Sequence, residues 1–253
     1  MIQLKNAQEL AKMRRACQIS AEALKLAGRS IEAGMTTADL DKIIYDYIKR
    51  HGARPNFKGL YGFPGPACIS INDEVIHGIP SHSRQIRPGD IVSIDTGAAI
   101  NGFNGDNACT FPCGKVDIEA QRLMDVTKES LHRGIAAAVA GNRVGDIGHA
   151  VQSYVEENGF SVVRSFVGHG VGKELHEDPE VPNYGHAGHG VRLVNGMTIA
   201  IEPMVNQKHH SVKTLSDGWT VVTADGGLAA HFEHSVAILP GGPEILTIGW
   251  EEP

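Results

Sequence analysis

The sequence lacks several features that mark particular protein classes. Its 253 residues include only four cysteines, and these do not show the paired spacing of a zinc knuckle or a redox motif. We therefore expect Cys17, Cys68, Cys109 and Cys113 to be reduced and mostly buried, as in a cytoplasmic protein.

Long hydrophobic runs and a surplus of basic residues are missing as well. No run of about 18 apolar residues could span a membrane, and no apolar signal-peptide core follows the first residues. The formal net charge of −6 offers no surplus of cations for phosphates, which argues against nucleic acid as the main ligand. We expect a cytoplasmic globular protein that does not bind membranes.

Apolar residues at helical spacing predict four helices. The first covers residues 7–33, begins with a capping box at Asn6 and Glu9, and ends at Gly34. The second is capped by Thr36 or Thr37 and stops at Gly52. The other two follow Asp117, end at residues 141 and 159, and precede an ordered loop that runs to residue 190. Strands are predicted over residues 68–71, 197–201, 219–223 and 229–239, besides a hairpin at residues 91–111.

The hairpin carries two acids. Asn101-Gly102 is the strongest short-range signal for a hairpin turn, and apolar runs flank it. A turn there places Asp95 diagonal to the residue opposite Asp106, so both side chains point to one face of the sheet. Adjacent carboxylates repel each other, so they either share a proton, hold cations between them, or lie solvated on the surface.

An internal repeat relates the two parts of the chain. The same offset of 107 residues carries Gly89 to Gly196 and Asp95 to Glu202. It also carries Ala33, Gly34, Asp39, Tyr47 and Gly52 to Ala140, Gly141, Asp146, Tyr154 and Gly159. We therefore predict one domain built from two similar halves, roughly residues 1–115 and 116–253, related by an approximate twofold axis.

Five side chains could converge at that axis. They are Asp95, Asp106, His169, Glu202 and Glu233, and His169 lies within the glycine-rich segment 168–172, whose backbone could turn tightly around it. On the predicted strand 229–239, His231, Glu233 and Ser235 share one face. Four carboxylates need counter-cations, and an oxygen-dominated site with one histidine suits Mn²⁺, Fe²⁺ or Co²⁺. Such a set can hold two divalent ions, as in a metallo-aminopeptidase or another hydrolase.

In order and spacing, these residues resemble the methionine aminopeptidases of the pita-bread fold. The resemblance covers nearly the whole chain. Its motifs are Asn104-Gly105-Asp106, Gly168-His169-Gly170-Val171-Gly172, His176-Glu177-Asp178-Pro179, Ile201-Glu202-Pro203 and Phe232-Glu233-His234. The short interval between His169 and Glu202 indicates a type 1, bacterial or organellar enzyme. The implied fold is α+β, with helices outside a central antiparallel sheet.

The resemblance also implies roles for individual residues. Asp95, Asp106 and Glu233 would hold or bridge two divalent ions (Co, Mn, Fe or Zn), and His169 and Glu202 would complete one coordination shell. Glu202 would also shuttle a proton. His176 would hydrogen-bond the scissile carbonyl, and His77 would hold the substrate near the scissile amide. The apolar cup for methionine would comprise Phe57, Leu60, Phe63, Cys68, Leu175 and Trp219. The sequence departs from the family pattern at Leu60, Leu175 and Asn104, which leaves the shape of the pocket open.

The expected substrate is the N-terminal peptide of a nascent polypeptide whose second residue is small. We expect a monomer, and transient association with the ribosome stays open. An X-Pro aminopeptidase or prolidase, and an inactive binding module of the same fold, are the alternatives. Glu177 and Asp178 are interpreted as solvated loop acids. The histidines without an expected role as ligands are His186, His189, His209, His210 and His234.

Overall fold

The computed structural model describes residues 2–250, so Met1 and residues 251–253 of the predicted domain lie outside the described residues. A nine-stranded sheet forms its centre, and the paired strands are antiparallel. Its strands are β1 (Arg54–Pro55), β2 (Ala67–Ile71), β4 (Ile91–Ile100), β5 (Phe103–Pro112), β7 (Gly168–Gly170), β8 (Glu177–Val181), β9 (Thr198–Ile201), β14 (Glu233–Leu239) and β15 (Gly242–Ile245). The main order is β1-β4-β5-β14-β9-β7-β8, while β2 pairs with β4 and β15 with β14.

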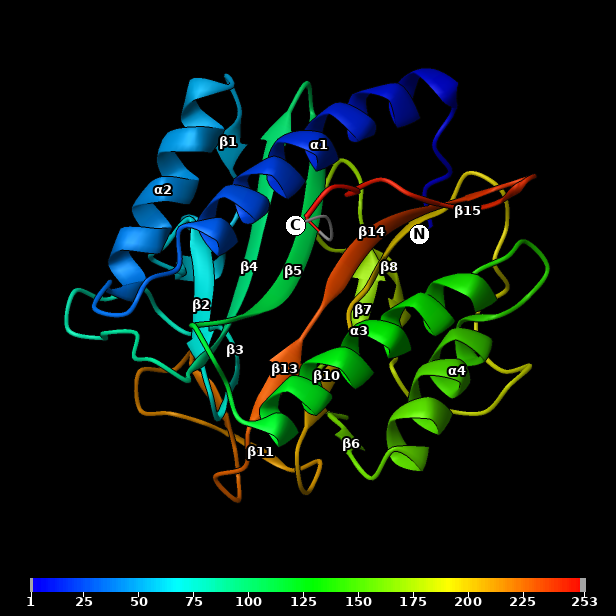
Figure 1. The fold of residues 1–253 in the computed structure, drawn as a ribbon. Coiled ribbons are helices and arrows are strands. Elements are labelled where there is room, and N and C mark those ends of the chain that lie inside the picture. Colours follow the sequence, from blue (N-terminus) through cyan, green and yellow to red (C-terminus); the bar gives the residue numbers. More distant parts are fainter. Residues whose placement is uncertain (1, 251–253) are drawn as a thin grey trace.

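Two pairs of helices flank this sheet (Figure 1). The first pair is α1 (Ala7–Arg29) and α2 (Thr37–Arg50), and the second is α3 (Ile118–Ala137) and α4 (Val144–Glu157). Helix α1 packs against β4 and β5, and α3 packs against β14 and β9. The predicted α+β class, with helices outside a central antiparallel sheet, is confirmed.

The helix starts follow the capping signals in the sequence. The Asn6 side chain accepts hydrogen bonds from the amides of Gln8 and Glu9, and the Glu9 carboxylate accepts one from Asn6 in return. The prediction that α1 extends to residue 33 was wrong, because the helix is capped at Ser30, whose hydroxyl donates to the carbonyl of Leu26.

The 107-residue offset also appears in the contacts of the backbone. The Gly34 amide donates to Ile86 O at 2.9 Å, and the Gly141 amide donates to Leu193 O at 2.9 Å. The isolated bridges Thr36–Gln85 and Arg143–Arg192 are related by the same offset. We propose on this basis that the chain is one domain whose halves meet near residue 115.

Several strands differ from the prediction. The strand expected over residues 229–239 is two strands in different sheets, because at residue 232 the backbone amide turns to donate to Pro203 O. Residues 168–190 contain β7 and β8 rather than only a loop. In the central sheet, the prediction also missed β1 and β15. Outside that sheet, the short strands missed or shifted are β3 (Glu74–Ile76), β6 (Ser161–Val162), β10 (Met204–Asn206), β11 (Val212–Thr214), β12 (Val221–Thr223) and β13 (Ala229–His231). They form two further sheets, in the orders β13-β10-β6 and β11-β12-β3.

The glycines of the segment 168–172 serve close packing more than tight turning. A Cβ at Gly168 would lie 2.3 Å from Ala200 O, and one at Gly170 would lie 2.2 Å from Asp178 O. Any side chain at these two positions would push β7 away from β9 and β8. The glycines therefore keep His169 inside the sheet.

The cysteines and the helices also fit the sequence. All four cysteines are buried thiols rather than disulfides. Over residues 2–250, every helix is too short or too polar to cross a lipid bilayer.

Candidate metal centre

Five neighbouring strands of the central sheet each bring one polar side chain to a common place. The sheet order β4-β5-β14-β9-β7 sets their sequence in space. Asp95 and Glu233 both lie opposite Ala108, one on each side of β5. Asp106 lies two residues before Ala108 on β5, so its side chain points to the same face. The five residues are Asp95 on β4, Asp106 on β5, Glu233 on β14, Glu202 directly after β9, and His169 on β7.

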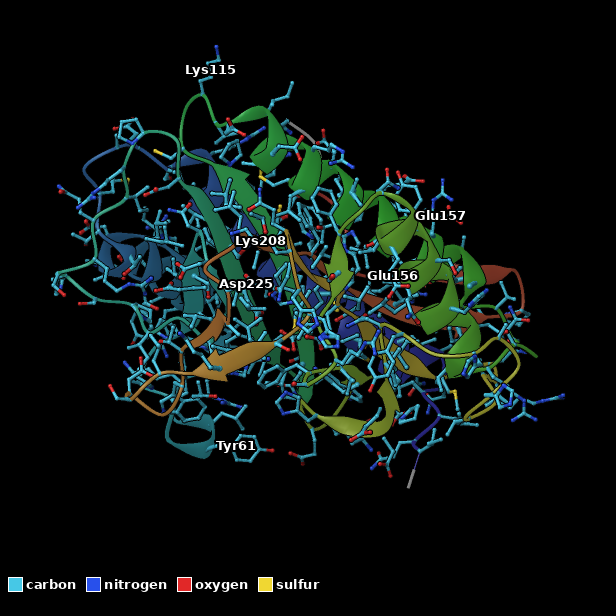
Figure 2. All side chains as sticks on the ribbon, turned by 90° about the horizontal axis from the view of Figure 1, so that it is seen from below. Tyr61, Lys115, Glu156, Glu157, Lys208 and Asp225 are labelled. Atoms are coloured by element: carbon cyan, nitrogen blue, oxygen red, sulfur yellow. The ribbon has the colours of Figure 1, made fainter. Side chains whose placement is uncertain are left out.

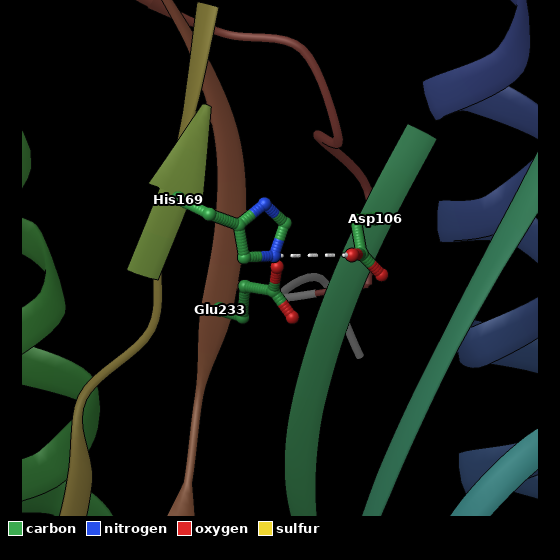
Figure 3. A group of neighbouring side chains, drawn as sticks. All are labelled: Asp106, His169 and Glu233. Carbon is green, nitrogen blue, oxygen red and sulfur yellow. Dashed lines mark ion pairs between the residues drawn. The ribbon is translucent and has the colours of Figure 1, made fainter. Parts of the chain in front are cut away.

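The histidine lies between acids from both halves. Its Nε2 lies 3.7 Å from Asp106 Oδ2 and 3.5 Å from Glu202 Oε1. One ligand atom each from Asp106, His169 and Glu233 lies within 4.8 Å of the others. Figure 3 shows the three side chains converging from different strands. His169 Nδ1 contacts Gly170 O at 2.8 Å, which leaves Nε2 directed at the acids.

The four acids, here called the acid cluster (Asp95, Asp106, Glu202 and Glu233), cannot all ionise in the protein alone. Burial raises the pKa of Asp106 to about 7. Burial, and then the neighbouring carboxylates, raise the pKa of the other three well above the usual range. The pKa of His169 falls to about 4, mainly through burial, so the imidazole is neutral near pH 7. A cluster of this kind requires protons or cations.

The donor atoms fit divalent cations. Among the described residues, one buried oxygen each of Asp95, Asp106 and Glu233 has no hydrogen-bond partner. Native proteins rarely leave buried carboxylate oxygens unsatisfied, and a neutral imidazole nitrogen facing them completes a nitrogen and oxygen donor set. The residues therefore can hold metal, and the orphaned oxygens mark where it would bind.

A cavity of about 740 Å³ opens beside the acid cluster. Its lining includes all six residues of the predicted apolar cup, four of which are buried as one cluster, namely Phe57, Phe63, Cys68 and Leu175. Leu60, Ile79 and Trp219 pack against that cluster. The structure thus brings the apolar cup and the acid cluster into one cavity.

The two predicted catalytic histidines also face this cavity. The ring of His176 lies edge-on to that of His169, with centroids 4.4 Å apart. His77 makes edge contacts with Phe166 at 5.7 Å and with Trp219 at 6.3 Å. Burial lowers the pKa of His176, and lowers that of His77 to about 4, so both rings are neutral near pH 7.

Backbone strain singles out two residues at the cavity. Four non-glycine residues in the described chain have positive φ, and two of them are asparagines in turns. The other two are Tyr61 (φ 49°) and His77 (φ 59°), and both line the cavity. Strain of this kind concentrates at functional sites. Tyr61 was absent from the predicted site, yet its ring stacks on His176 at 6.1 Å and is 76% exposed at the molecular surface (Figure 2).

Sequence reasoning also missed His231 and misjudged the acid Glu177. His231 Nε2 lies 3.6 Å from Glu202 Oε2, and the residue is 1% exposed. Its place on the polar face with Glu233 was the available signal. Glu177 was expected to be a solvated loop acid, but that was wrong, because its side chain is 5% exposed and pairs with Lys5. Asp178 is exposed, as expected.

Comparison with known proteins identifies the family. The sequence model described as metallopeptidase family M24 matches residues 11–240. The chain is 56% identical over 248 residues to the methionine aminopeptidase of Clostridium perfringens, covering 98% of this chain and 99% of that protein. The chain belongs to the methionine aminopeptidases of metallopeptidase family M24.

Solved structures of the family share the fold. The methionine aminopeptidase of Thermotoga maritima superposes with a TM-score of 0.96 at 44% identity, covering 98% of this chain and 99% of that one. The prolidase of Pyrococcus furiosus shares the fold at 24% identity and a TM-score of 0.79, but this chain covers only 65% of it. The pita-bread fold is confirmed, and the prolidase alternative is not favoured.

The three departures from the family pattern lie at the cavity or beside it. Leu60 and Leu175 belong to the apolar cup, to which they contribute aliphatic side chains. Asn104 is buried at 5% exposure, and its Nδ2 donates to Gly172 O at 3.1 Å and to Lys173 O at 2.9 Å. Asn104 thus joins the hairpin to the segment that leads to His176.

Proposed function

We propose that the protein is a metal-dependent aminopeptidase that removes the N-terminal methionine from proteins whose second residue is small. The observation that carries this proposal is the position of the apolar cup beside the acid cluster within one cavity. An apolar side chain in the cup would bring the first peptide bond to the acids.

The metal ligands follow from the donor set. Asp95, Asp106 and Glu233 would hold or bridge two divalent ions, and His169 and Glu202 would complete the shell of one of them. Such ions supply Lewis acidity, which activates a water molecule and polarises a carbonyl group. Co, Mn, Fe and Zn are the candidates, and the predominance of oxygen donors favours Mn²⁺, Fe²⁺ or Co²⁺.

Three side chains would then act on the substrate. Glu202 would take a proton from the attacking water and return it to the leaving amine. His176 would donate a hydrogen bond to the scissile carbonyl oxygen as negative charge develops there. His77, fixed between Phe166 and Trp219, would hold the substrate near the scissile amide.

The apolar cup would select methionine. Phe57, Phe63 and Cys68 are buried in its wall, with exposed fractions of 8%, 4% and 5%. A flexible thioether side chain gains from contact with aromatic rings. Trp219, Leu60 and Leu175 would complete the cup, and the restriction to a small second residue is taken from the family resemblance.

We also propose the setting in which the enzyme works. The four buried thiols fit a reducing compartment, which supports a cytoplasmic location. The substrate would be the N-terminal peptide of a nascent polypeptide, the enzyme a monomer, and any association with the ribosome transient.

Methionine release from short peptides tests the proposal. Metal-stripped protein would be assayed with Met-Ala-Ser, Met-Leu-Ser and Ala-Pro-Ser, with and without added Mn²⁺, Co²⁺ or Fe²⁺. We expect metal-dependent release of methionine from Met-Ala-Ser, much slower release from Met-Leu-Ser, and an intact Ala-Pro-Ser. Cleavage of Ala-Pro-Ser alone would support an X-Pro peptidase instead. Bound metal with no cleavage of any peptide would indicate a binding module.

A further inference from the structure

A buried ion pair adjoins the candidate site, and Glu177 belongs to the lining of the cavity. The Lys5 ammonium contacts the Glu177 carboxylate, and the two side chains are 4% and 5% exposed. Lys5 precedes α1, whereas Glu177 opens β8 and directly follows His176. The pair therefore joins the first residues of the described chain to the residue next to a proposed catalytic histidine.

We propose that the Lys5–Glu177 ion pair is a positioning device that holds His176 in place for catalysis. This inference rests on the proposed function, because it takes His176 to contact the scissile carbonyl. Neither Lys5 nor Glu177 would touch the reacting atoms.

Lys5 is itself firmly fixed. Its backbone amide donates to Gly196 O at 2.7 Å, and its Nζ donates to Gln3 O at 3.1 Å. Gly172 leaves the space that the pair occupies, since a Cβ there would lie 2.5 Å from Lys5 Nζ and 2.6 Å from Glu177 Oε1. This contact gives the last glycine of the segment 168–172 a specific purpose.

Glu177 fixes the segment that carries His176. Its Oε1 accepts a hydrogen bond from the Glu174 amide at 3.2 Å, and its backbone pairs with Gly170 of β7. His176 lies in the bend that leads into β8, directly before Glu177. With Glu177 held against Lys5, this bend is held in place, and the ring of His176 lies 4.4 Å from that of His169.

Stability alone does not account for a buried ion pair. Desolvation offsets much of the attraction between two buried charges, and an apolar pair of similar size is often equally stable. A fixed pair does impose one geometry on the groups that it joins. Because the pair lies next to His176, the geometry that it imposes includes the orientation of the His176 side chain.

A double-mutant cycle with His176 tests the proposal. Lys5→Met/Glu177→Gln removes both charges and leaves neither one buried alone. Lys5→Gln/Glu177→Gln, which also leaves neither charge buried alone, is the second variant if the first fails to fold. Each would be made with His176 intact and with His176→Ala, and kcat, KM, bound metal and Tm would be measured with Met-Ala-Ser. Arg14→Met is the matched control, because Arg14 forms an exposed long-range pair with Glu244 at 2.7 Å.

We expect the double variant to lower kcat about tenfold, since small misplacements of catalytic groups have effects of this size or larger. KM and bound metal should change little, and Arg14→Met should change none of the four quantities. In the His176→Ala background the tenfold loss should disappear.

An equal loss of kcat in both backgrounds would overturn the inference, as would no loss with His176 intact. If the His176→Ala variant kept the activity of the original protein, the proposed role of His176 would be refuted. This outcome is read from His176→Ala alone, without the ion-pair variants. If that variant were fully active, the inference would fall with the role of His176.

Discussion

The two halves of the molecule agree in one strand and differ in the next. In the first half, β4 carries Asp95 and enters β5 through the turn Asn101-Gly102, which brings Asp106 to the same face. In the second half, β9 precedes Glu202, but residues 202–232 intervene before β14 supplies Glu233. Both halves thus contribute two acids from paired strands, although only the first does so with a hairpin.

The residues between β9 and β14 contribute features that have no counterpart in the first half. The offset of 107 would carry Asp106 to Lys213, which is exposed on β11. Residues 202–232 instead provide Trp219 at the cavity and His231 beside Glu202. Repetition accounts for Asp95 and Glu202, and departure from repetition accounts for Glu233 and for the surroundings of the substrate. Variants on either side of this division should therefore fail in different ways.

Asp106→Asn should have the largest effect. It removes an acid whose unsatisfied oxygen faces the metal position, so bound metal and activity should fall together, the latter by more than about 100-fold. Metal analysis and methionine release on the same samples would measure both. Normal turnover by this variant would refute the site.

His176→Ala should affect chemistry without affecting metal. Removal of one donor to a developing oxyanion typically lowers kcat by about 100- to 1,000-fold. Bound metal should stay at the level of the original protein, because His176 contacts His169 only ring to ring. An unchanged kcat would rule out the oxyanion role.

His231→Leu should have a smaller effect on metal binding. The buried Nε2 of His231 faces Glu202 Oε2 at 3.6 Å, and the loss of a group that orients a metal ligand typically lowers metal affinity or activity about 10- to 100-fold. His231→Gln, which retains a donor, is the matched control and should recover most of the loss. Equal affinities for the two variants, measured by competition with a chelator, would contradict this role.

The pH dependence of stability should differ between metal-free and metal-loaded protein. Above pH 7 the site histidines, whose pKa values are lowered, are neutral in both the folded and the unfolded states. The acid cluster retains protons in the folded state, because the pKa of Asp106 is about 7 and burial raises those of the other three acids well above the usual range, whereas unfolded carboxyls are ionised. The folded state then binds more protons, so the free energy of unfolding decreases as the pH rises.

We expect the free energy of unfolding of the metal-free protein to fall as the pH rises through about 7, where Asp106 loses its proton, and to change much less with Mn²⁺ bound. Urea unfolding at several pH values would measure it. The same pH dependence with and without metal would contradict the account of the acid cluster.

Local signals in the sequence were sufficient for the hairpin and for most helix starts. Asn101-Gly102 fixed the register that brings Asp95 and Asp106 together, and the capping boxes at Asn6 and Thr36 fixed two helix starts. The repeat then indicated that Glu202 would lie with them. These features depend on residues close in sequence or on a constant offset.

Features that depend on distant neighbours could not be read in this way. Strand β7 is too short and glycine-rich to show alternation, and it exists because β9 and β8 accept it closely. The burial of Glu177 requires Lys5, which lies 172 residues earlier in the chain. The break at Phe232 depends on a carbonyl of Pro203, so the pattern of the segment 229–239 alone gave no sign of it.

The most direct test of the central claim is the location of bound metal. A crystal of the protein grown with Mn²⁺ and measured for anomalous scattering should show two ions about 3.5–4 Å apart among Asp95, Asp106, His169, Glu202 and Glu233. Ions bound elsewhere, or an acid cluster that stays without metal at saturating Mn²⁺, would contradict the claim that these five residues form the metal centre.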